Sequence, residues 1–139
     1  MGLDQYGFAV MPHRDNTDFK WVWSVAEATD GKINQIAYWR KHPNLQGWME
    51  NLYRDKRAAS GDPIDDGDWQ SFNCEPLRLT AGDLDALEAA VKGGSLPPTE
   101  GFFFGVDSDD EYLDDDLRFV SDARKAMLQD MEIYYYSWW

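Results

Sequence analysis

Residues 72–94 read FNCEPLRLTAGDLDALEAAVKGG and place an extended segment directly before a helix. The extended segment runs to Leu79, and Thr80 and Asp83 then have the spacing of a capping box, in which each side chain accepts a hydrogen bond from the other residue's backbone N–H. The leucines and the valine that follow mark one buried stripe, and the Gly-Gly pair supplies the stop. A strand and an amphipathic helix in direct succession favour a fold that contains both.

Two further helices are expected, one on each side of this unit. Before it, apolar residues from Leu45 to Tyr53 follow the i, i+3, i+4, i+7 spacing of an amphipathic helix, and Pro43 suits its first turn. After it, a helix is expected between residues 110 and 131, with the acidic run 114–116 near the positive end of its dipole. The expected buried stripe of that helix is Leu113, Leu117, Val120, Met127 and Met131.

Alternating or continuous apolar runs predict strands in the rest of the chain. The expected strands are residues 6–10, 19–25, 33–39, 101–105 and 133–139. Asp30-Gly31 is a hairpin turn signal, although residues 36–39 break strict alternation in the return strand. Because strands and helices do not alternate regularly, we expect a single α+β domain over residues 1–139, with a mainly antiparallel sheet and about three helices.

The composition describes an acidic, aromatic-rich globular chain. The 139 residues carry a formal net charge of −13, and 43% of them are hydrophobic and 15% aromatic. Residues 1–60 hold eight basic and seven acidic side chains, so the acidic excess lies in residues 61–139. Because phosphate backbones are bound through Lys and Arg, direct nucleic-acid binding is not expected. The acidic part either solvates the protein, meets a basic partner or imitates a nucleic acid.

Neither a membrane segment nor a catalytic motif stands out in the sequence. The opening residues 1–4 lack the basic and apolar regions of a signal peptide, and we expect the protein in the cytoplasm. No nucleophile elbow, phosphate loop or zinc-ligand spacing is present, so no cofactor and no metal is expected. The acidic positions Asp107, Asp109 and Asp110 do not fit an EF-hand and favour a solvated loop over a divalent site.

The most suggestive local cluster is Arg40, Lys41 and His42, directly before the expected helix N-terminus. Unpaired N–H groups at a helix start can hold a phosphate or a carboxylate, and three neighbouring cations would assist them. The alternative is that Arg40 and Lys41 pair with the acidic C-terminal part of the same molecule.

The single cysteine, Cys74, has two interpretations. Beside Phe72 it would be a small, inert core side chain. On an edge strand it would be free to form an intermolecular disulfide and link two chains.

Three motifs carry a family resemblance. They are Tyr-Trp-Arg-Lys at 38–41, Gly-Phe-Phe-Phe-Gly at 101–105 and Ser-Trp-Trp at 137–139. With the residues around them, the chain resembles a family of small proteins encoded by tailed bacteriophages, including phages of cyanobacteria. The resemblance implies a phage gene product in the cytoplasm of an infected bacterium and carries over no catalytic residue.

The leading hypothesis for function is a non-enzymatic phage accessory protein that acts through protein–protein contacts, either with itself or with a host protein. The aromatic surplus supports it, because aromatic residues are enriched at interfaces. One alternative is an acidic nucleic-acid mimic that inhibits a host DNA-binding protein. Another is a small anion-binding protein or enzyme that uses Arg40, Lys41 and His42.

Overall fold

One antiparallel sheet and three helices make up the described part of the chain. A computed structural model describes residues 2–11, 33–65, 68, 71–97 and 109–139. The elements in chain order are β1 (Asp4–Val10), β2 (Ile33–Arg40), α2 (Pro43–Ala59), β3 (Leu77–Leu79), α3 (Ala81–Lys92), α4 (Asp109–Met127) and β4 (Glu132–Trp138). The sheet order is β2-β1-β4-β3, and all three strand pairs are antiparallel. The predicted α+β class is therefore confirmed.

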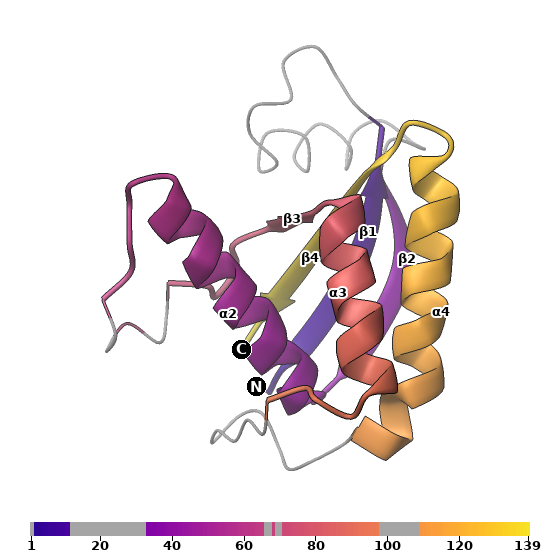
Figure 1. Ribbon diagram of the computed structural model, residues 1–139, viewed down its shortest axis with the longest axis horizontal. Coiled ribbons are helices and arrows are strands. Elements are labelled where there is room, and N and C mark those ends of the chain that lie inside the picture. Colours follow the sequence, from indigo (N-terminus) through magenta and orange to yellow (C-terminus); the bar gives the residue numbers. More distant parts are fainter. Residues whose placement is uncertain (1, 12–32, 66–67, 69–70, 98–108) are drawn as a thin grey trace.

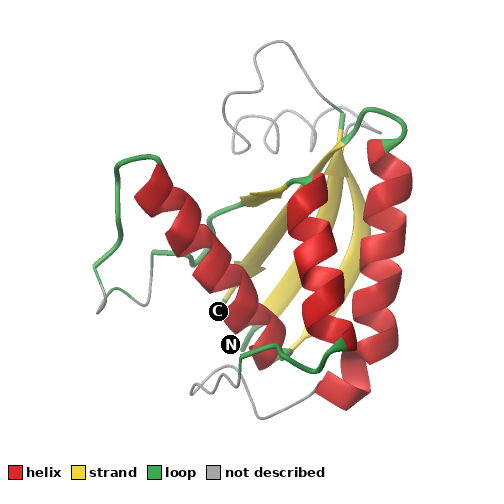
Figure 2. Cartoon of the chain, viewed as in Figure 1, coloured by secondary structure: helices red, strands yellow, loops and turns green. Residues whose placement is uncertain are grey.

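The helices lie on one face of the sheet. Figure 1 shows α3 and α4 side by side over the strands, with α2 running obliquely to their left, and Figure 2 shows the same layering by secondary structure. The main core lies between these layers. In it the Trp39 indole and the Phe119 ring meet edge to face, with their centroids 5.1 Å apart. The rings of Tyr53 in α2 and Phe72 stack with their centroids 4.7 Å apart.

Local signals for the helix boundaries are confirmed. The Thr80 hydroxyl accepts from the Asp83 N–H at 3.2 Å, and the Asp83 carboxylate accepts from the Thr80 N–H at 2.8 Å. Helix α3 ends at Lys92, directly before the two glycines, and α2 begins at Pro43. Among the described residues, no helix combines the length and the hydropathy of a membrane span.

A β-bulge explains the broken alternation in the return strand. Gly7 pairs with Ala37 and Phe8 with Gln35, so Ile36 is an extra residue in β2. Because of the extra residue, the in-and-out alternation of side chains before Ile36 is out of phase with the alternation after it, as is usual at a bulge. The break at residues 36–39 is therefore a feature of a paired strand and not a sign against it.

Two sequence expectations are corrected. The segment 72–79 was expected to be extended throughout, but residues 71–74 form turns and the strand is confined to Leu77–Leu79. In α4 the buried residues are Asp116, Phe119, Ala123 and the expected Val120, whereas Leu113 is 39% exposed. Leu117, Met127 and Met131 of the expected stripe pack partly buried against the core, so the correction concerns Leu113 alone. The expected strands at 19–25 and 101–105, and the turn at 30–31, lie outside the described residues.

Aromatic side chains gather on the sheet face opposite the helices. In β1 and β4 the residues on this face alternate with those of the main core, and Phe8 and Val10 are themselves buried here, with Tyr6, Tyr134 and Tyr136 partly buried against them. Cross-strand neighbours form three rows: Arg40–Asp4–Trp138, Tyr38–Tyr6–Tyr136 and Gln35–Phe8–Tyr134. We call this surface the outer face.

Gly7 allows α4 to approach β1 closely. A Cβ atom built on Gly7 would lie 2.4 Å from Cε1 of Phe119 and 3.2 Å from Cβ of Ala37. Phe119 is buried and sits against the Trp39 indole, so it has little room to withdraw. The absence of a side chain at position 7 therefore sets the distance between the helix layer and the sheet.

We expect Gly7→Ala to lower the free energy of unfolding by about 1–3 kcal/mol, because it overpacks the core at Phe119. Urea denaturation measures the change. Gly82→Ala is the matched control, because a Cβ at position 82 meets only Thr80 Oγ1 at 3.8 Å. In a helix that change should raise stability by up to about 1 kcal/mol. Equal stability of Gly7→Ala and the parent protein would contradict the close approach.

Candidate functional site

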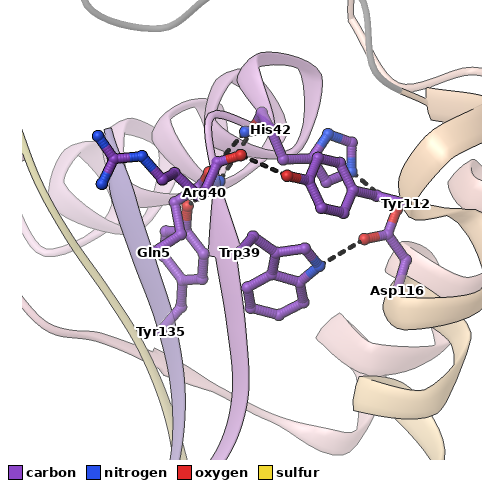
Figure 3. Close-up of polar contacts among 7 residues, drawn as sticks. All are labelled: Gln5, Trp39, Arg40, His42, Tyr112, Asp116 and Tyr135. Carbon is purple, nitrogen blue, oxygen red and sulfur yellow. Dashed lines mark hydrogen bonds and ion pairs between the residues drawn. The ribbon is translucent and has the colours of Figure 1, made fainter. Parts of the chain in front are cut away.

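The structure does not bring the three predicted cationic residues together. The Arg40 guanidinium is 54% exposed and pairs with the Asp4 carboxylate at 3.4 Å. Lys41 is exposed and has a left-handed backbone with φ 56°, whereas the His42 side chain is completely buried. Figure 3 shows the Arg40 guanidinium directed away from the His42 ring. Anion binding by this cluster stays a prediction that the geometry does not favour.

His42 belongs to a buried polar network (Figure 3). Its Nε2 atom lies 2.9 Å from Oδ2 of Asp116, and Oδ1 of the same carboxylate accepts from Nε1 of Trp39 at 2.9 Å. The Tyr112 ring stacks on the imidazole with centroids 4.8 Å apart, and the Tyr112 hydroxyl donates to the Arg40 carbonyl oxygen. Helix α4 therefore contacts the end of β2 and the start of α2 through polar groups.

Gln5 joins this region to the sheet. Its Oε1 atom accepts from the His42 N–H at 2.8 Å, and its Nε2 atom donates to the His42 carbonyl oxygen at 3.0 Å. The same Nε2 donates to the Tyr135 hydroxyl at 2.8 Å, which donates to Oε1 of Gln46 at 2.6 Å. Burial raises the pKa of Tyr135 far above its ordinary value, so the hydroxyl stays a donor.

This network positions elements and has no access for a substrate. Gln5, His42, Gln46 and Asp116 are each at most 1% exposed. A histidine next to a carboxylate is a common catalytic pair, but catalysis requires that the imidazole reach a reacting group. The sequence signal that could have found Asp116 is its spacing from Phe119 and Ala123 on one helix face.

Charged groups of the described chain pair widely with one another. The Lys56 ammonium lies 2.6 Å from the Asp83 carboxylate, and the Arg124 guanidinium contacts Asp85 at 2.7 Å and Glu88 at 2.8 Å. Lys56 thus joins the near-neutral part of the chain to the acidic part. Among the described residues, no group of three His, Cys, Asp or Glu side chains could hold a metal ion.

A cavity of about 390 Å³ opens on the outer face. It is lined by Tyr6, Phe8, Gln35, Cys74, Tyr136 and Trp138. These residues come from β1, β2, β4 and the turn before β3, so the cavity crosses the strands. Its aromatic walls with a few polar groups are typical of small-molecule sites.

Cys74 is exposed and lies at this cavity, so the core interpretation of the cysteine was wrong. Its backbone has φ 62°, and its N–H donates to the Ser137 carbonyl oxygen at 2.9 Å. The turn therefore holds the residue beside β4. Burial, and then contact with the Cys74 thiol, raise the pKa of Tyr136 to about 12. The intermolecular disulfide stays a prediction.

We expect Asp116→Ala to lower the free energy of unfolding by at least about 2 kcal/mol, because each buried polar group that loses its partner costs about 1–3 kcal/mol. His42 and Trp39 both lose a contact with the carboxylate. Asp115→Ala is the matched control: its surface pair with Arg118, at 3.7 Å, is worth less than about 1 kcal/mol. Urea denaturation of the two variants checks the difference, and equal losses would contradict the role of Asp116.

We also expect stability to fall as the pH rises from about 10 to about 12. In the unfolded chain tyrosine ionises near pH 10. Burial and a bond to Glu132 raise the pKa of Tyr134 to about 12, close to that of Tyr136. The unfolded state loses its protons first, so the stability contributed by these groups is present below pH 10 and lost above it. Denaturation at several pH values measures the fall in stability, which should be shallower in the double variant Tyr134→Phe, Tyr136→Phe. A fall of the same size in the double variant and in the parent protein would refute the assignment to these two tyrosines.

No family model, no curated protein and no solved structure matches the chain.

Proposed function

We propose that the chain is an accessory protein of a tailed bacteriophage that works in the cytoplasm of the infected bacterium, by docking its outer face on a basic host protein. The observation that carries the proposal is the exposure of large aromatic side chains on this face. Tyr38 is 46% exposed and Trp138 is 45% exposed, and both stand beside the partly buried Tyr6 and Tyr136. Tyrosine and tryptophan are the residues most enriched where proteins bind each other.

The charge of the chain supports a basic partner. A net charge of −13 opposes close approach of a second copy and attracts a surface of opposite sign. Asp4 lies on the outer face between Arg40 and Trp138, and its pairing with Arg40 leaves no excess positive charge in that row. A partner with Lys or Arg around an apolar centre therefore fits both the aromatic side chains and the overall field.

The family resemblance supports the phage origin. Two of its motifs, at 38–41 and 137–139, lie on strands that flank β1 in the sheet. Asp4 of β1 is paired with Arg40 on one side and with Trp138 on the other. Residues of the two motifs are thus close to one another in space. A docking surface formed by both motifs would explain this closeness.

The two alternative functions gain less support from the geometry. An enzyme or anion-binding protein built on residues 40–42 would need the buried His42 imidazole at the surface. A nucleic-acid mimic needs a continuous row of free carboxylates at phosphate-like spacing. Asp83, Asp85 and Glu88 instead pair with cations of the same molecule.

A photo-crosslinking amino acid at position 38 or 138 tests the proposal in lysate of a cyanobacterial host. We expect both positions to capture the same basic protein, whereas position 128, where Leu128 is 87% exposed in the turn directly after α4, does not. The captured protein is then purified and its affinity measured. Tyr38→Ser and Trp138→Ser should each weaken binding at least about tenfold, the range of an interface hot spot, and Leu128→Ser should not.

Capture at all three positions, or unchanged affinity of the serine variants, would refute docking through the outer face. Crosslinking of the chain only to itself would refute the host-protein partner in favour of self-association. Raising the salt concentration should slow association, because attraction between opposite charges is screened.

A further inference from the structure

The cavity on the outer face, called the slot below, crosses the strands. Gln35 of β2 is the register partner of Phe8 in β1, and Tyr6 of β1 is the partner of Tyr136 in β4. Neighbouring strands lie about 4.8 Å apart, so the floor from β2 to β4 is about 10 Å wide. This is the length of two fused or linked aromatic rings.

The walls and ends of the slot differ in chemistry. The rings of Tyr6 and Phe8 are nearly parallel, with centroids 5.7 Å apart and planes inclined by 12°, and Tyr136 and Trp138 add two more aromatic side chains. The Gln35 carboxamide lies at the β2 end, and the Cys74 thiol lies at the opposite end, beyond β4. Aromatic walls favour a flat aromatic guest, and the two ends can hydrogen-bond to it.

The local field discriminates against anions. The Glu75 carboxylate lies near enough to Tyr136 to disfavour ionisation of its hydroxyl, and the chain as a whole carries −13. The faces of aromatic rings are also electron-rich, so they attract cations. A negatively charged guest would meet repulsion from each of these sources.

We propose that this slot is a binding site for a flat aromatic molecule that carries no negative charge. The molecule lies across β1 against the aromatic side chains, with its ends toward Gln35 and Cys74. The six lining residues named above belong to the described part of the chain, and none of them comes from a partner protein. Its occupation is therefore testable on the purified protein alone.

Two dyes of similar size provide the test. Thioflavin T is flat and cationic, whereas 8-anilinonaphthalene-1-sulfonate is anionic. Fluorescence titration should show saturable binding of thioflavin T at one site, with the sulfonate bound at least about tenfold more weakly. Bound thioflavin T should also slow alkylation of Cys74 by iodoacetamide, because the thiol lies at the end of the slot.

Variants of two equally exposed aromatic residues locate the binding. Trp138→Ala removes a lining ring and should weaken thioflavin T binding about tenfold, as loss of a stacking partner does. Tyr38→Ala is the matched control, because Tyr38 has almost the same exposure on the same face and does not line the slot. Gln35→Lys brings a positive charge to one end of the slot at an exposed position, so it should weaken binding of the cationic dye. This variant keeps the location testable if Trp138→Ala does not fold.

The absence of saturable thioflavin T binding would overturn the proposal. Equal affinity for the two dyes would overturn the charge selectivity, and equal loss in Tyr38→Ala and Trp138→Ala would overturn the location. If the protein captures the host protein but does not bind thioflavin T, only this site is refuted. If it binds thioflavin T but captures no host protein, only the proposed function is refuted.

Discussion

The pairing of the Gln5 carboxamide with the peptide groups of His42 is the constraint on which the arrangement of the layers depends. One side chain of the first strand contacts both the N–H and the carbonyl of the residue that caps α2. The His42 side chain makes no local cap, so the long-range contact sets where the helix begins. Because Gln5 also holds the Tyr135 hydroxyl, β1, β4 and the helix start share one set of hydrogen bonds.

Asp116 extends the same constraint to α4. A carboxylate can enter a protein interior only if its oxygens have partners, and here Trp39 and His42 provide them from the sheet and the helix start. The requirement fixes the rotation of α4, which in turn brings Phe119 over Gly7. These polar contacts therefore determine which apolar residues of α4 and the sheet pack together. The outer face holds the aromatic side chains of the sheet that do not take part in this packing.

Features that depend on neighbours in sequence could be predicted, and features that depend on distant residues could not. The capping box at Thr80 and Asp83 and the start of α2 at Pro43 follow from local spacing, and the structure confirms both. The buried state of His42 and Asp116 could not be foreseen, because these residues are 74 positions apart and their pairing needs the complete fold. The same holds for Cys74, whose exposure follows from a left-handed turn attached to β4.

The β-bulge at Ile36 affects how the sheet behaves toward other sheets. In the described part of the chain, β2 and β3 are the two outer strands. An outer strand with regularly spaced free amides is a template for strand addition and fibre growth. Strand β3 has only three residues, and the bulge interrupts the regular spacing in β2. Both edges of the described sheet are therefore poor templates for strand addition, although the sheet is rich in tyrosine and tryptophan.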